Sequence, residues 1–146
     1  MKKTFFIIVL ILLVLTCVAV YYVNTYRAQM NKVQNLNKEY EVYYNTNLLG
    51  SQLISVINKT MDYNQKNEIQ KEENDKYYID NEENSIKIYI QFIYGEETKT
   101  LLMEDISSGG SEAFVRNYST VKFKCTKIDY HEKTNHVKSL TFEEVN

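Results

Sequence analysis

The chain of 146 residues contains no proline and no tryptophan, and it has only four glycines and two cysteines. Its first glycine is Gly50, so neither of the two residue types that interrupt helices most strongly occurs before that position. One long helix can therefore begin near the N-terminus and extend far toward Gly50.

The two cysteines are far apart and lie in different kinds of sequence. Cys17 stands inside an apolar segment, whereas Cys125 lies far downstream among alternating polar and apolar residues. If the apolar segment enters a membrane, the two thiols lie in different phases, which excludes a disulfide within one chain. Such sparing use of cysteine, with abundant tyrosine, asparagine, lysine and isoleucine, suggests a bacterium of low GC content.

Acidic residues are absent from the start of the chain, where Glu39 is the first of 19. Only Lys2 and Lys3 among the 17 basic residues precede Asn24, so the part after Asn24 is net negative. Its densest charge cluster, over residues 68–83, is acidic as well. Binding of a phosphate backbone requires clustered basic side chains. We therefore predict that the chain has no nucleic-acid partner.

The one long apolar run begins shortly after the two N-terminal lysines. From Phe5 to Val23 the sequence carries no charge, and only Thr16 and Cys17 are mildly polar. A helix over this run is about 28 Å long, close to the ~30 Å of a membrane's hydrocarbon core. We predict a membrane anchor over residues 1–23, with membrane lipid as its partner and a surface formed by Phe5, Phe6, Leu10, Leu13, Val20 and Val23.

The flanking residues predict how this anchor is oriented. The basic N-terminus favours the cytoplasmic side, and Tyr21 and Tyr22 fall where aromatic side chains gather at a membrane interface. We expect an uncleaved signal anchor in a bacterial cell membrane, with the rest of the chain outside. Two alternatives stay open. Small residues over 17–19 also fit a signal-peptide cleavage site, and Val14-Leu15-Thr16-Cys17 resembles the motif that is lipidated on cysteine.

A second apolar pattern follows the anchor. Side chains three or four residues apart, with one longer gap, form a single stripe on a helix, made of Tyr26, Met30, Val33, Tyr40 and Tyr44. We predict an amphipathic stalk helix over residues 24–64, with a bend at Gly50. The stripe packs either on the chain's own domain or on a neighbouring subunit's helix. Asn37 faces water in the first case and fixes the register in the second.

Residues 65–146 are predicted to form a small extracytoplasmic domain. Apolar residues alternate from Ile86 to Tyr94, and a second strand follows a turn at Gly95. Two further strands, Val121 onward and Val137 to Glu143, form a hairpin, with a bulge near Lys127 where the alternation changes phase. The fold class is therefore α+β, with a long N-terminal helix packed on roughly four antiparallel strands.

Three patterns resemble chemical sites, and each fails on its spacing or ligands. His131 and His136 are five residues apart in an expected turn, whereas a helical zinc motif needs a separation of four. The segment from Asp62 to Glu73 resembles a calcium-binding loop, but Asn67 replaces its required glycine. Cys125 falls at an apolar position of an alternating strand pattern, which is where a buried thiol is expected. We predict no catalytic site, no metal and no cofactor.

The order of elements, a helix that is half membrane span and half stalk and then a β-sheet, resembles that of type IV pilins and type II secretion pseudopilins. Phe5 and Phe6 supply the aromatic start of those families, and Thr4 stands where they have glycine. The first acidic residue is Glu39, whereas the families place a glutamate close to the processed end. The resemblance implies that the exposed half of the helix packs against other subunits.

Two functions are consistent with the sequence. The first is a structural or assembly component of the cell envelope, such as a pilin-like accessory subunit, that meets other envelope subunits through the stalk. The second is a monomeric, membrane-anchored or secreted binding module that recognises a protein or a small ligand. They differ in what the stalk stripe contacts.

Overall fold

The computed structural model describes residues 2–73, 76–95 and 97–145, and the fold is α+β. The chain divides into two compact units, Met1–Asn35 and Leu36–Asn146. The first is helical throughout its described length. The second contains the last residues of that helix, three further helices and a five-stranded sheet.

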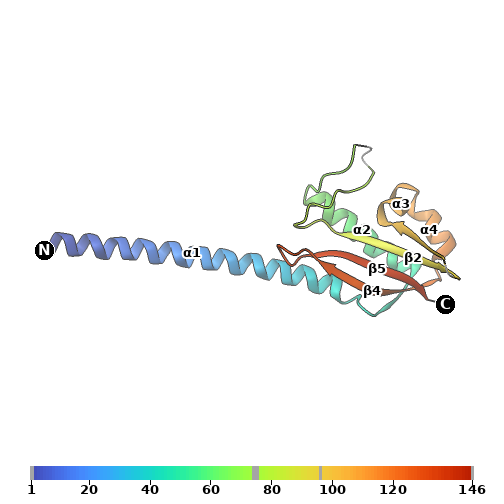
Figure 1. The fold of residues 1–146 in the computed structure, drawn as a ribbon, viewed down its shortest axis with the longest axis horizontal. Coiled ribbons are helices and arrows are strands. Elements are labelled where there is room, and N and C mark those ends of the chain that lie inside the picture. The colour runs from blue at the N-terminus through green and yellow to red at the C-terminus, as the bar shows by residue number, and fades with distance from the viewer. Residues whose placement is uncertain (1, 74–75, 96, 146) are drawn as a thin grey trace. The chain divides into compact units, whose positions relative to one another are not determined.

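Helix α1 spans Lys2–Glu41 without interruption (Figure 1). Within the described residues it is the one helix that is long and apolar enough to cross a membrane, by length and composition. No part of its most apolar window is buried by the described protein. The side chains of the predicted span, Phe5, Phe6, Leu10, Leu13, Val20 and Val23, are all exposed.

The helix ends at Glu41, so the stalk expected over residues 24–64 is two helices separated by a short strand. Neither glycine nor proline ends it. Asn45 takes a left-handed conformation with φ 58°. Its amide donates to the carbonyl of Cys125 at 2.8 Å, and the Cys125 amide donates to the carbonyl of Thr46 at 3.3 Å. Pairing with a distant strand therefore replaces the next helical hydrogen bonds.

The chain then forms strand β1, Asn47–Leu49, and helix α2, Gly50–Lys66. Glycine is required at the junction because a Cβ on Gly50 would lie 2.0 Å from the carbonyl oxygen of Tyr118. Helix α2 packs its apolar side chains on the domain, since Leu53 and Ile57 are fully buried in the core. The segment from Asp62 to Lys66 is helical, which is not the conformation of a calcium-binding loop.

The sheet contains β2 (Lys87–Tyr94), β3 (Glu97–Leu102), β4 (Lys122–Tyr130) and β5 (Val137–Val145) besides β1. Its order is β1-β4-β5-β2-β3. The expectation of four antiparallel strands was wrong in two respects. There are five strands, and β2 runs parallel to β5, with Ile88 opposite Leu140.

The predicted hairpin is confirmed as β4 and β5, which pair antiparallel. The predicted bulge is confirmed too, because the register shifts between Cys125 and Lys127. Cys125 faces the core and is fully buried. The bulge turns the second half of β4 so that Ile128 is opposite Leu140.

Two short helices, α3 (Met103–Ser108) and α4 (Ser111–Tyr118), follow β3. Helices α2, α3 and α4 pack together on one face of the sheet (Figure 1). Phe114 of α4 lies 6.0 Å from Phe123 of β4, and Phe123 lies 5.6 Å from Phe92 of β2, between ring centroids. This aromatic layer joins helix to sheet.

Candidate functional site

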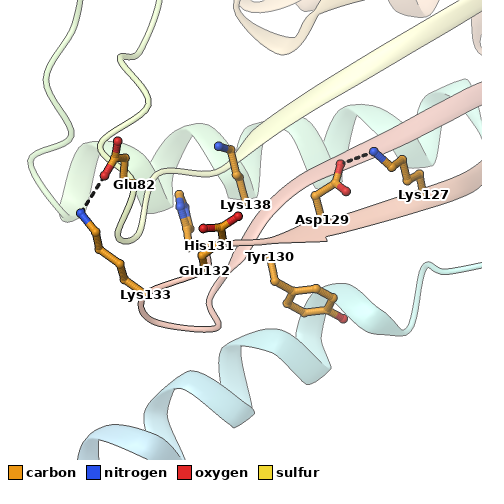
Figure 2. A pocket seen from close by; sticks show the side chains of 8 residues that line it. All are labelled: Glu82, Lys127, Asp129, Tyr130, His131, Glu132, Lys133 and Lys138. Atoms are coloured by element: carbon orange, nitrogen blue, oxygen red, sulfur yellow. Dashed lines mark hydrogen bonds and ion pairs between the residues drawn. The ribbon is translucent and has the colours of Figure 1, made fainter.

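Three segments distant in sequence meet at one end of the domain: the last helical residues of α1, Leu36–Glu41, the acidic loop 80–85, and the turn 131–136 between β4 and β5. We call this place the hairpin junction. Figure 2 shows the cleft beside it, with side chains from the loop and from both hairpin strands. All three segments belong to the second compact unit.

The acidic loop is held by one of its own side chains. The Asn81 Oδ1 atom accepts hydrogen bonds from the amides of Glu83, Asn84 and Ser85, at 3.1, 3.0 and 2.9 Å. Asparagine favours such local bonds to its own backbone, which compete with regular structure. The loop is therefore preformed, and its carboxylates are displayed in fixed positions.

Lysines of the hairpin neutralise these carboxylates. Lys133 lies 2.7 Å from Glu82, and Lys138 lies 2.6 Å from Asp80. Partial burial acts to raise the pKa of Asp80, but the bonds from Lys138, the Glu82 amide and Ser85 outweigh it and leave that pKa below its usual value. The hydrogen bond from Lys133 likewise lowers the pKa of Glu82. At neutral pH these ion pairs therefore hold the acidic loop to the hairpin.

The two histidines of the turn lie in different surroundings. His131 is only 2% exposed; its Nε2 lies 2.7 Å from the carbonyl oxygen of Ser85, and its Nδ1 lies 4.0 Å from Asp80. His136 is half-buried, and its Nδ1 atom is buried with no hydrogen-bond partner among the described residues. Burial, and next the proximity of His131, lower the pKa of His136.

The turn is also attached to the end of α1. The Asn37 Nδ2 donates to the carbonyl of Asn135 at 2.6 Å, and the amide of Val137 donates to the Asn37 Oδ1 at 2.9 Å. Tyr130 donates its hydroxyl to Glu41 at 2.9 Å. Burial and the Glu41 carboxylate raise the pKa of Tyr130 to about 12, so this hydroxyl remains a donor at all ordinary pH values.

The cleft of Figure 2 has a volume of about 490 Å³ and is lined by Glu82, Lys127, Asp129, Tyr130, His131, Glu132, Lys133 and Lys138. Most of its charged groups are paired with each other, as Lys127 is with Asp129 at 2.9 Å. Within residues 2–73, 76–95 and 97–145, no three His, Cys, Asp or Glu side chains gather closely enough to hold a metal. The cleft is thus suited to contacts with polar groups.

A second groove of about 440 Å³ lies on the other side of Tyr130 and is lined by Glu41, Tyr44, Thr126, Lys127, Ile128 and Tyr130. Its aromatic walls are open to solvent, since Tyr44 is 57% and Tyr130 41% exposed. The two hollows together surround the end of β4. Tyr130 and Lys127 line both hollows, and Tyr130 is directed toward α1 (Figure 2).

The structure separates the residues of the predicted stripe. Tyr40 is fully buried in the domain core, where its hydroxyl lies 3.3 Å from Thr60. Tyr44 lies beyond the end of the helix and is exposed. Tyr26 is exposed, Met30 is partly exposed and Val33 is 9% exposed. Of the five residues, Tyr40 is therefore inaccessible to a partner helix.

Sequence reasoning did not identify Asn37 as the residue that attaches the helix end to the hairpin. It was expected to face water or to fix the register of a coiled coil, and instead both atoms of its amide are used within the domain. The one available signal was an asparagine interrupting an apolar stripe. That signal shows that the position is special, but it does not identify the partner.

In comparisons with protein-family models, with curated proteins and with solved structures, the chain matches none.

Proposed function

We propose that this chain is a single-pass membrane protein of a bacterial cell envelope, in which α1 anchors and carries an extracytoplasmic α+β domain that serves a structural or assembly role. The supporting observation is the uninterrupted course of α1, from a solvent-open apolar half to residues fixed inside the domain. No loop separates the two.

The exposed apolar half supports the anchoring role. Side chains of the size of phenylalanine, leucine and isoleucine surround the helix between Phe5 and Val23, and the described protein covers none of the most apolar window. A helix that is apolar on all sides requires either a protein core or a bilayer around it. A bilayer satisfies this requirement with the N-terminal lysines on the cytoplasmic side.

The assembly role depends on the stalk residues that remain accessible. Tyr26 and Met30 lie on one face of α1 and are at least partly exposed, whereas Tyr40 is buried in the domain core. We therefore restrict the proposed partner surface to Tyr26 and Met30. Its occupant is a helix of another envelope subunit, as in pilin-like assemblies, and a pilin-like accessory subunit is the form of this proposal that we favour.

The proposal is tested by crosslinking in the native membrane. A photoreactive residue at Met30 is expected to capture a discrete partner band, and the same residue at Ala28 on the opposite face is the matched control. Adding Tyr26→Glu is expected to abolish the Met30 adduct while the domain remains folded. Equal adducts from both faces, or an adduct that survives Tyr26→Glu, would reject the stalk as an assembly surface.

The cleft of the hairpin junction favours a second candidate, a membrane-anchored binding module. Its mixed lysines and carboxylates offer contacts to a polar ligand or peptide. A thermal-shift screen on the full chain should then identify ligands that raise the unfolding temperature of the wild type but not that of Lys127→Ser. Lys122→Ser changes an exposed lysine of the same strand outside the cleft and should leave that effect intact. A screen without such ligands would exclude this candidate.

A further inference from the structure

His136 lies between the two backbone groups that hold the end of α1. The carbonyl of Asn135 accepts from Asn37, and the amide of Val137 donates to Asn37. Any rearrangement of the backbone at His136 therefore displaces both partners of Asn37 at once. Asn135 has a left-handed conformation with φ 56°, which asparagine adopts readily in turns.

The position of the His136 ring favours its neutral form. Its Nδ1 is buried and has no partner among the described residues. Protonation would put both a charge and an unsatisfied N–H group at that position, and burying either without a partner is costly. No ion pair within 4.0 Å joins His136 to a described carboxylate.

The charged groups of the surrounding segments do not compensate this charge. On the turn and β5 these groups are His131, Glu132, Lys133 and Lys138; on the acidic loop they are Asp80, Glu82 and Glu83; on the end of α1 they are Lys38, Glu39 and Glu41. Three of these carboxylates already have other partners: Asp80 pairs with Lys138, Glu82 with Lys133, and Glu39 with Lys59 at 2.8 Å. His131 repels a protonated His136 rather than stabilising it.

His131 provides the internal contrast. It is more deeply buried than His136, yet its Nε2 lies against the Ser85 carbonyl and its Nδ1 faces Asp80. The same turn thus contains one buried histidine whose ring nitrogens lie near protein acceptors and one whose buried Nδ1 has no partner among the described residues.

We propose that His136 is an acid-sensitive latch, whose protonation opens the 131–136 turn and releases Asn37, so that this attachment of α1 to the turn is lost in mildly acidic surroundings. The proton comes from solvent and no covalent bond changes. Opening exposes the ring to water, which solvates the charge. The domain core, which lies around α2 and the sheet, does not participate.

The expected pH range follows from the histidine itself. Its pKa in the folded turn lies below the ordinary value of 6.5. The closed turn is therefore favoured fully above pH 6.5 and loses that advantage as pH falls from 6.5 toward the folded pKa. Over that interval the population of the open turn should rise by up to about tenfold per pH unit.

The test is amide hydrogen exchange, resolved by NMR, on the full chain in lipid nanodiscs between pH 7.5 and 5.0, corrected for intrinsic exchange rates. The amide of Val137 reports the latch directly because it donates to Asn37. Its opening ratio is expected to rise as pH falls in the wild type and to stay constant in His136→Gln. Amides of β2 in the core serve as the internal reference and should not change.

Three results would overturn the proposal: a Val137 opening ratio that is constant with pH in the wild type, a pH-dependent ratio that persists in His136→Gln, or an equal change at the β2 amides. Should His136→Gln misfold, Asn37→Ala supplies the second variant. It is expected to show a high Val137 opening ratio already at pH 7.5, with little further rise on acidification. A ratio as low as in the wild type at pH 7.5 would also refute the latch.

Discussion

Three asparagine side chains of this domain make hydrogen bonds to backbone groups that would otherwise be supplied by another stretch of backbone. Asn81 closes the acidic loop, Asn37 joins α1 to the hairpin, and Asn64 joins α2 to the start of β2. Asn64 is fully buried; it donates to the carbonyl of Ile86 at 2.7 Å and accepts from the amide of Ile86 at 3.0 Å. One residue thus satisfies a backbone donor and a backbone acceptor where no strand is available to do so.

The role of Asn64 leads to a prediction about stability. Asn64→Leu should destabilise the domain by about 2–4 kcal/mol, because it leaves the buried amide and carbonyl of Ile86 without partners. Thermal or denaturant unfolding of the full chain in detergent measures the change. Asn58→Leu, the same substitution at an exposed position of α2, is the control and should differ from the wild type by no more than about 0.5 kcal/mol. Equal effects of the two variants would show that Asn64 is replaceable.

At the scale of elements, the sequence predicted what depends on local pattern. Alternation identified β2 and the hairpin of β4 and β5, the turn at Gly95 indicated β3, and the change of phase near Lys127 located the bulge. The sequence could not predict that β2 pairs parallel with β5, because alternation gives the faces of a strand but not its neighbours. Strand β1 was missed because its three residues continue a pattern that also fits a helix.

The lack of information about neighbours also explains why the candidate site could not be predicted from the sequence. The hairpin and the turn that contains His131 and His136 were expected from the sequence, and both exist. The meeting of the hairpin with the acidic loop was not predictable, since Lys138 and Asp80 are far apart in sequence and any of several lysines would fit the carboxylate equally well. The end of α1 at Glu41 depends in the same way on pairing of Asn45 with Cys125.

The ion pair between loop and hairpin gives a pH prediction of defined sign. The pKa of Asp80 lies below its usual 3.8 in the folded chain, so its carboxylate stabilises the fold above pH 3.8, and that contribution is lost as pH falls through the lowered value. Asp80→Asn should therefore weaken the domain at pH 7 and have a smaller effect near pH 3. Urea unfolding of both proteins at the two pH values measures this difference. An effect that grows on acidification would contradict the assignment.

At the scale of the whole molecule, the chain combines a helix that is apolar for its first half with an acidic domain that has its own core. The two parts are joined within one helix, so the residues that are proposed to lie in the bilayer are continuous with Asn37 and Tyr40, which belong to the domain. Anchoring, export and assembly through Tyr26 and Met30 are successive parts of the proposal. All of them require the domain to be outside and the helix to be retained.

The most direct measurement places reporters after Asn146: alkaline phosphatase, which is active only outside the cytoplasm, and a fluorescent protein that folds only inside it. We expect phosphatase activity in a full-length, membrane-bound product and no fluorescence, and loss of both export and membrane retention in the double variant Leu10→Arg, Leu13→Arg. Fluorescence with inactive phosphatase, or a full-length product that washes from membranes in buffer, would contradict the account.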